Sequence, residues 1–360
     1  MATKRINEID ISKGIGILLV IIGHSLPEMS ETREWIYSFH MPLFFLLTGL
    51  VINLPEKWDT KAQIAKERTL ITNYMVWSCV YWVFDFAIRY FIMQKTSLIS
   101  LLCRGYQTIC LYGINVLWFI STLIIGKLMT KWICSRVKNQ RLQILIFISL
   151  YALSSIIATV LPETPTGKAE MLIVYPSTVI VRSFTASAFI YAGHMLKGAV
   201  HKLINSTSLV YSLLIGGCAI FITIMAFRLV GYVDIHVLRY GNSVLLAFNS
   251  VAALVGVICI AKIFNQIYIF SKFFTFLGEN SLLIMLTHEY LMIKTVIAYV
   301  TQLLVPNINP NLYVFIEITA LVATESLICI LFGRKINSAI GKINEILSRM
   351  LDKRHTGKEM

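Results

Sequence analysis

Hydrophobic residues fill most of the chain in long runs that short polar segments separate. A helix needs about 20 apolar residues to cross a bilayer, with tolerance for shorter or tilted segments. Ten runs fit this description, at residues 14–26, 35–53, 70–93, 116–131, 143–161, 172–196, 208–230, 243–264, 281–305 and 312–332. The first and the fourth of these runs are short. The pattern therefore predicts an all-α integral membrane protein, a bundle of about ten transmembrane helices.

The polar segments between the runs differ in their content of Lys and Arg. One side of the predicted bundle receives most of them, namely Lys4, Arg5, Lys13, Lys57, Lys61, Lys66, Arg68, Lys131, Arg136, Lys138, Arg141, Lys197, Lys202, Lys262, Lys272 and the tail 334–358. The opposite side receives Arg33, Lys95, Arg104, Lys168, Arg228 and Arg239, among several acidic residues. Cytoplasmic loops of membrane proteins carry the excess of positive residues. Both termini are therefore predicted to be cytoplasmic.

The composition agrees with a membrane protein and argues against two other classes. A hydrophobic content of 57% and a mean hydropathy of +0.72 are too high for an ordinary soluble domain. The formal net charge of +13 would suggest a nucleic-acid partner if the positive residues formed one patch, but they follow the predicted topology instead. The seven cysteines stand singly, with no His at ligand spacing, so neither a disulfide framework nor a metal site is predicted.

The chain divides into a polytopic membrane domain at 1–333 and a basic tail at 334–360. In the tail, four isoleucines recur at helical spacing among Lys and Arg residues, at 336, 340, 343 and 346. This pattern suits an interfacial helix on an anionic leaflet, so membrane lipids are expected partners. The polar segment 231–242 is predicted to be external, either covering a binding site or serving as an ordinary solvated connection.

The first apolar run is bracketed by ionisable residues. Lys13 and His24 are eleven positions apart. On a helix they share one face to within about 20° and lie about 16 Å apart along the axis. Asp10 lies about 40° from the same line. Ionisable residues in membrane helices are functional candidates, and imidazole can take up and return a proton near neutral pH. His24 is therefore either an acid–base catalyst or a histidine that only bonds a neighbouring helix.

The second run contains Ser38-Phe-His-Met-Pro-Leu-Phe-Phe-Leu-Leu-Thr48. Pro42 removes a backbone hydrogen bond and predicts a kink, and Thr48 allows close approach of another helix. His40 either lines a cavity with His24 or bonds the carbonyl that Pro42 leaves free. Lys66 and Arg68 open the third helix, where they are either membrane anchors or a clamp for phosphate groups.

Further polar residues interrupt the apolar runs. Asp85 and Arg89 stand at i and i+4 and are predicted to pair. Arg182 lies in the sixth run, and His288 is predicted about two turns into the ninth, after a helix start near Asn280. Trp118 either belongs to an interfacial belt or contacts a ligand. Together these residues suggest a hydrated or substrate-lined interior.

These motifs resemble the membrane acyltransferase 3 family, and within it the branch of fucose 4-O-acetylase-like proteins. The resemblance covers nearly the whole chain. It depends on five motifs in order: Asp10 with Lys13-x10-His24, Phe39-His-Met-Pro-Leu-Phe-Phe-Leu-Leu-Thr-Gly49, Lys66-x-Arg68, Leu117-Trp-Phe119, and Leu277-Gly-Glu-Asn-Ser-Leu-Leu-Ile-Met-Leu-Thr-His288.

The resemblance implies an O-acetyltransferase that moves an acetyl group from cytoplasmic acetyl-CoA to a hydroxyl of an extracytoplasmic or lipid-linked glycan. It implies a multi-pass protein of the cell membrane, as in a bacterial plasma membrane. His24, with Lys13 and Asp10, would act in transfer, and His288 would stabilise the oxyanion. Lys13, Lys66, Arg68 and Trp118 would contact the donor, acetyl-CoA, without a metal cofactor.

The predicted substrate cavity comprises a further set of polar and small residues from the second, third and sixth runs: His40, Pro42, Thr48, Asp85, Arg89 and Arg182. A transporter or flippase of a glycan or acyl metabolite is the alternative, because intramembrane charges and proline-broken helices also occur in transport pathways. No repeat between the halves of the chain supports this alternative, and the ionisable residues concentrate in the first three runs.

Overall fold

The computed structural model describes residues 6–92, 94, 98–289, 291–305 and 309–356. Lys4, Arg5, Lys95 and Lys358, which entered the charge argument, lie outside the described residues. The described residues form α1 (Asn7–Ser25), α2 (Glu31–Tyr37), α3 (His40–Val51), α4 (Thr60–Lys66), α5 (Arg68–Ala87), η1 (Ile88–Ile92), α6 (Leu98–Ile109), α7 (Leu117–Arg136), α8 (Gln140–Ala158), α9 (Lys168–Ser206), α10 (Leu209–Val230), η2 (Ile235–Val237), α11 (Ser243–Gln266), α12 (Tyr268–Glu279), α13 (Ser281–Thr287), α14 (Ile293–Leu304), α15 (Pro310–Ile328), η3 (Cys329–Gly333) and α16 (Arg334–Thr356).

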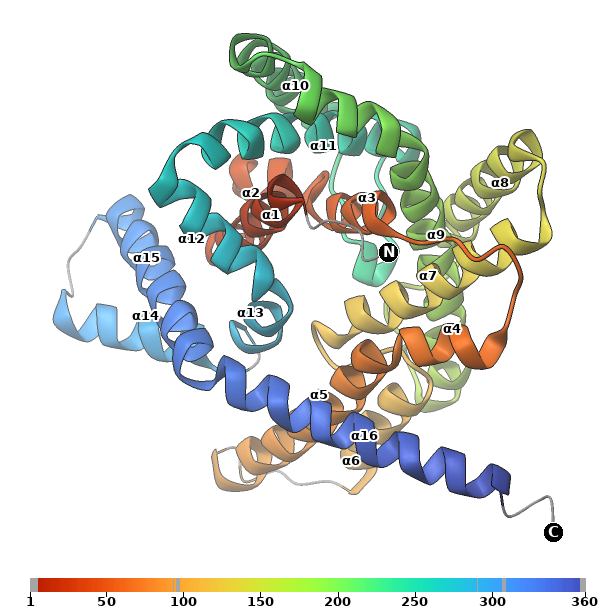
Figure 1. The fold of residues 1–360 in the computed structure, drawn as a ribbon. Helices are drawn as coiled ribbons and strands as arrows, with labels where there is room; N and C mark the ends of the chain where they lie inside the picture. The colour runs from red at the N-terminus through yellow and green to blue at the C-terminus, as the bar shows by residue number, and fades with distance from the viewer. Residues whose placement is uncertain (1–5, 93, 95–97, 290, 306–308, 357–360) are drawn as a thin grey trace.

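The helices form a bundle in which α1 and α3 lie near the centre and α8, α10 and α14 lie at the periphery (Figure 1). Within the described residues, seven helical segments are long and apolar enough to cross a membrane, or eight if the bent pair of α12 and α13 is one span. The prediction of an all-α membrane protein is confirmed. The predicted number of about ten spans and the cytoplasmic location of the termini stay predictions.

The central helix α1 is approached closely by α12, and two glycines make this approach possible. A Cβ atom built on Gly14 would lie 2.0 Å from the Phe274 carbonyl oxygen, and one built on Gly278 would lie 1.9 Å from the Asp10 carbonyl oxygen. A side chain at either position would force the two backbones apart. The close packing fixes α12, and the helix that follows it, against the stretch that carries Lys13 and His24.

The second predicted span is interrupted, because α2 ends at Tyr37 and α3 begins at His40. Pro42 lies in the first turn of α3, where its missing N–H would have no partner within the helix. The break at Ser38 and Phe39 lies one turn before Pro42, where the proline ring would meet the carbonyl four residues back, so the disturbance predicted from Pro42 falls at the start of α3. The Ser38 carbonyl, four residues before Pro42, accepts from Asn249 Nδ2 at 3.4 Å.

The prediction of one helix over 281–305 is also wrong. Helix α13 ends at Thr287 and α14 begins at Ile293, after Met292 adopts a left-handed conformation with φ of 59°. Helices α12 and α13 meet at an angle of 63°. The apolar residues on both sides of the break hid it from the sequence pattern. As a result, His288 and Glu289 lie at the break between α13 and α14 and not inside a continuous helix.

The basic tail forms a helix, as its isoleucine spacing predicts. Helix α15 continues through the π-helical turn η3 into α16, which crosses beside α5 (Figure 1). Ile340 of α16 is buried, and the Thr72 hydroxyl of α5 bonds the Asn344 side chain of α16. The tail therefore packs on the bundle over part of its length, while its contact with a lipid leaflet stays a prediction.

Candidate active site

Cavities follow α1 from its N-terminal half to its C-terminal end. The first, the Lys13 cavity, has a volume of about 760 Å³ and is lined by residues of α1, α3 and α9, including Asp10, Lys13, Lys197 and His201. The second, the middle cavity, has a volume of about 250 Å³ and is lined by Lys13, Thr48, Phe44, Phe119 and Met285, among others. Lys13 therefore faces both cavities.

The third, the His24 cavity, also has a volume of about 250 Å³ and shares Phe44, Phe119 and Met285 with the middle cavity. The fourth, the side cavity, has a volume of about 520 Å³ and shares His24, Arg33 and Glu289 with the His24 cavity. The cavities thus form a series in which neighbours share lining side chains. The series begins at Lys13 and reaches His24, the two residues that the helical spacing placed on one face of α1.

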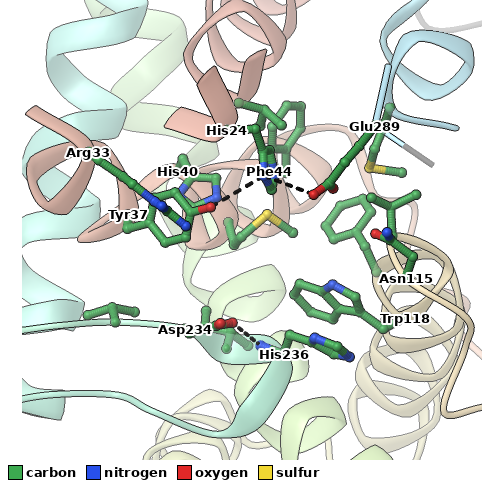
Figure 2. A pocket seen from close by; sticks show the side chains of 17 residues that line it. His24, Arg33, Tyr37, His40, Phe44, Asn115, Trp118, Asp234, His236 and Glu289 are labelled. Carbon is green, nitrogen blue, oxygen red and sulfur yellow. Dashed lines mark hydrogen bonds and ion pairs between the residues drawn. The ribbon is translucent and has the colours of Figure 1, made fainter. Parts of the chain in front are cut away.

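His24 stands between a hydroxyl and a carboxylate. Its Nδ1 atom lies 3.4 Å from the Tyr37 hydroxyl and 3.6 Å from Glu289 Oε1 (Figure 2). The carboxylate favours the tautomer with the proton on Nδ1, which leaves the lone pair on Nε2. Such an imidazole can accept a proton from a substrate, and the carboxylate stabilises the cation that forms. The geometry supports a role for His24 as a general base.

His288 lies beside His24, with the ring centroids 5.4 Å apart. Its Nδ1–H donates to the carbonyl oxygens of Ile284 at 2.9 Å and Met285 at 3.1 Å. In the neutral ring Nε2 therefore carries a lone pair, and among the described residues this buried atom has no partner. The structure confirms that His288 is near His24. In the neutral ring Nε2 can accept a hydrogen bond but cannot donate one, so the role of His288 as an oxyanion donor requires a protonated ring and stays a prediction.

His40 lines the same cavity as His24. Its Nδ1–H donates to the Ile36 carbonyl oxygen at 3.0 Å, whereas the carbonyl that Pro42 leaves free belongs to Ser38. The first of the two interpretations of His40 therefore holds. Pro42 itself does not line the cavities, and Thr48 lines the middle cavity as expected.

Trp118 lines the His24 cavity on the side opposite His24, where it stacks on His236 with 5.5 Å between the centroids (Figure 2). Arg182 is fully buried behind this wall and lines none of the four cavities. Its Nη2 atom donates to the Tyr112 carbonyl oxygen at 2.7 Å, and its guanidinium lies 5.4 Å from the Trp118 ring centroid. The prediction that Arg182 lines the substrate cavity is wrong, because this side chain supports the cavity wall instead.

Asp85 and Arg89 form the predicted pair, with Arg89 Nε 2.8 Å from Asp85 Oδ2. Arg104 of α6 approaches the same carboxylate oxygen at 3.5 Å. Neither residue of the pair lines any of the four cavities. Their assignment to the substrate cavity is therefore wrong, because spacing along a helix predicts a pair but not the neighbours that the helix face meets.

Lys66 and Arg68 also lie outside the four cavities, and Lys66 is exposed. The residue between them, Glu67, is 2% exposed and pairs with Lys127 at 2.5 Å and with Lys131 at 2.6 Å. Burial alone would raise the pKa of Glu67, but the two ammonium groups outweigh it and hold the pKa below its usual value. The second lysine that lines the Lys13 cavity is Lys197. In the sequence, Lys197 contributed only to the predicted membrane topology.

Several residues of the His24 cavity were missing from the predicted site. Arg33, Tyr37, Asn115 and Glu289 line it, and so does the segment 233–236. Glu289 follows His288 directly in the sequence, but no motif or spacing along the chain predicts that Glu289 contacts His24. The predicted external segment 231–242 thus contributes to the cavity wall, and the interpretation that it covers a site is the better one.

Comparison with protein families decides the class of the protein. Residues 6–332 match the model of the acyltransferase 3 family, which is described as an acyltransferase domain. The chain belongs to the acyltransferase 3 family. Comparison with curated proteins and with solved structures gives no match.

Membership of the acyltransferase 3 family makes this chain a membrane acyltransferase, as the sequence motifs imply.

His24, His288 and Glu289 also form a group of possible metal ligands, with atoms up to 4.8 Å apart. Ligands of one tetrahedral zinc ion lie about 3.4 Å from one another. The three groups are thus spaced more loosely than the ligands of one bound zinc ion.

Proposed function

We propose that this acyltransferase moves an acetyl group from cytoplasmic acetyl-CoA to a sugar hydroxyl of a cell-surface or lipid-linked glycan, as the fucose 4-O-acetylase-like branch would. The observation that carries the proposal is the series of cavities that begins at Lys13 and reaches His24. A donor and an acceptor that enter from opposite ends of such a series meet at the imidazole.

In this proposal the donor occupies the Lys13 cavity and the middle cavity. Lys13 and Lys197 supply two cations for the phosphate groups of CoA, in a cavity that the carboxylates of Glu8 and Asp10 also line. Lys13 Nζ pairs with Asp10 Oδ1 at 3.1 Å, so a phosphate group would compete with this carboxylate for Lys13. The pantetheine arm extends along the apolar middle cavity, and its reach is similar to the axial separation of about 16 Å between Lys13 and His24. Phosphate contacts are assigned to these lysines rather than to Lys66 and Arg68, which lie outside the cavity.

The acceptor occupies the His24 cavity. His24 Nε2 takes the proton of the sugar hydroxyl while the hydroxyl oxygen attacks the thioester carbonyl carbon. A C–O bond forms, the C–S bond breaks, and the thiolate of CoA leaves. The imidazolium, stabilised by Glu289, returns its proton to the thiolate. Every proton and bond is accounted for without a metal or a covalent enzyme intermediate.

The test uses the purified protein in proteoliposomes with acetyl-labelled acetyl-CoA at the Lys13 side. The acceptor is glycan extracted from cells that lack the gene. We expect label on the glycan and one free CoA for each acetyl group transferred. Movement of glycan across the membrane without release of CoA would overturn the proposal and support the transporter alternative.

A further inference from the structure

The side cavity gives a second approach to His24, which the donor does not use in the proposed arrangement. It shares His24, Arg33 and Glu289 with the His24 cavity. None of these three residues lines the middle cavity, along which the pantetheine arm is proposed to extend. The rest of the side cavity is lined by the segment 25–28 and by residues of α14 and α15. His24 can therefore be reached by one ligand from the middle cavity and by another from the side cavity.

The volumes of the two cavities indicate how an acceptor glycan is divided between them. The His24 cavity, at about 250 Å³, is smaller than the roughly 300–1,000 Å³ typical of small-molecule sites, and it has to receive the thioester group as well. The side cavity, at about 520 Å³, lies within that range. A glycan is longer than the one sugar that reacts. The side cavity therefore offers the space for the part of the glycan that continues beyond the reacting sugar.

Lys294 fixes the side cavity against the candidate base. Its Nζ atom donates to the His24 carbonyl oxygen and lies 3.8 Å from Glu317 Oε1, which joins α14 to the end of α1 and to α15. An ammonium group has three N–H donors, and among the described residues only the His24 carbonyl lies within hydrogen-bond distance of Lys294. The Lys294 side chain lines the side cavity and is 34% exposed. Its remaining donors are therefore available to a ligand in this cavity.

The lining of the side cavity carries both signs of charge. Arg33 and Lys294 are its cations, and Glu28, Glu289 and Glu317 are its carboxylates. The cations donate hydrogen bonds and the carboxylates accept them, so the lining can bind both the hydrogen and the oxygen of sugar hydroxyl groups. A lipid acyl chain in this cavity would remove these charged groups from water without giving them partners, which is unfavourable. The lining therefore suits a hydroxyl-rich glycan better than a lipid chain.

We propose that the side cavity is a subsite for the part of the acceptor glycan next to the reacting sugar, and that Lys294 donates to a hydroxyl group there. This inference rests on the proposed function, because it requires the reacting hydroxyl at His24. In the predicted topology Glu28 and Arg33 lie on the extracytoplasmic side, from which such a glycan would enter. The subsite adds binding energy from sugars that do not react.

The test places a larger side chain in the side cavity and uses the proteoliposome assay with the same extracted glycan. Val314 of α15 lines the side cavity and none of the other three. In Val314→Trp the indole occupies part of the subsite, so we expect the KM for the glycan to rise about tenfold. The KM for acetyl-CoA should change less than about twofold. The matched control is Leu312→Trp, because Leu312 is exposed on the same helix and lines none of the four cavities; both of its KM values should stay at the wild-type level.

A second pair of variants tests the contact of Lys294. Lys294→Met should raise the KM for the glycan about tenfold, the worth of one hydrogen bond to a charged group, and leave the KM for acetyl-CoA within about twofold. Lys294→Arg keeps a charged donor and should bring the KM for the glycan back to within about threefold of the wild-type value. If Val314→Trp does not fold, this pair decides by the same KM split.

An unchanged KM for the glycan in Val314→Trp would overturn the inference. Equal increases in both KM values, or equal effects of Val314→Trp and Leu312→Trp, would also overturn it by showing a general disturbance of the bundle. A Lys294→Met protein with a lower kcat and an unchanged KM for the glycan would show that Lys294 only positions His24, and would overturn the assigned contact. Absence of transfer by the wild-type protein would instead refute the proposed function.

Discussion

The close contact between α1 and α12 gives a prediction with a magnitude set by the structure. In Gly278→Ala, the new methyl group would lie 1.9 Å from the Asp10 carbonyl oxygen, whereas real Cβ atoms essentially never approach closer than 3.0 Å. The two backbones must therefore separate by about 1.1 Å, the difference between these two distances. Neither partner of the contact is a flexible side chain, so the helices themselves have to move.

This movement is expected to reach the catalytic groups. Helix α12 leads directly into α13, which ends beside His288 and Glu289, while His24 is on α1. Displacement of catalytic groups by about 1 Å can lower a rate about 100-fold. The overpacking is also expected to lower the free energy of unfolding by about 1–3 kcal/mol. Gly278→Ala should therefore fold, lose a few degrees in Tm and transfer acetyl groups about 100-fold more slowly.

The assay is the initial rate of CoA release from acetyl-CoA in the presence of glycan, with Tm measured on the same preparation. Gly217→Ala is the matched control, because Gly217 is also inside a helix but a Cβ atom there would meet nothing within 4 Å. We expect the rate and the Tm of this control to be unchanged or slightly raised. A Gly278→Ala protein with a rate within threefold of the wild type would refute the link between this helix contact and the site.

Three further predictions concern charged residues. Glu289→Gln should lower kcat about 100-fold or more with little change in the KM for acetyl-CoA, because the imidazolium of His24 loses its counter-charge. Lys13→Gln should raise the KM for acetyl-CoA about tenfold or more, and Lys66→Gln less than twofold; equal effects in steady-state kinetics would contradict the assignment of the donor site. Glu67→Gln leaves the buried Lys131 and the partly exposed Lys127 without a counter-charge and should cost about 3 kcal/mol in unfolding free energy. The folded-state pKa of Glu67 lies below its usual 4.5, so the loss of unfolding free energy in Glu67→Gln should be complete above pH 4.5. The loss should become smaller as the pH falls through the folded-state pKa, which thermal unfolding of both proteins at several pH values can check.

The sequence predicted those parts of the site that depend on local spacing. Lys13 and His24 share one helix face, so the 3.6-residue period was enough to place both on the same series of cavities. The Asp85–Arg89 pair was predicted for the same reason. The location of this pair was not predicted, because the helical period does not show which face of α5 packs toward the interior of the bundle.

Contacts between distant segments could not be predicted in this way. Glu289 meets His24 only because α13 stops after Thr287 and Met292 takes a left-handed conformation, and the apolar residues around this break read as one continuous helix. The wall made by Trp118 and His236 joins α7 to the turn before α11. Such a contact depends on how all the helices of the bundle pack, which residue spacing along the chain does not predict.

His24→Ala is the sharpest test of the proposal that His24 is the general base for transfer of the acetyl group from acetyl-CoA to the glycan. The measurement is the amount of label on the glycan after incubation of proteoliposomes with labelled acetyl-CoA, with His194→Ala as the control and with Tm to verify folding. We expect a folded His24→Ala protein with no transfer above background and a His194→Ala control at the wild-type level. Wild-type labelling of the glycan by His24→Ala would contradict it.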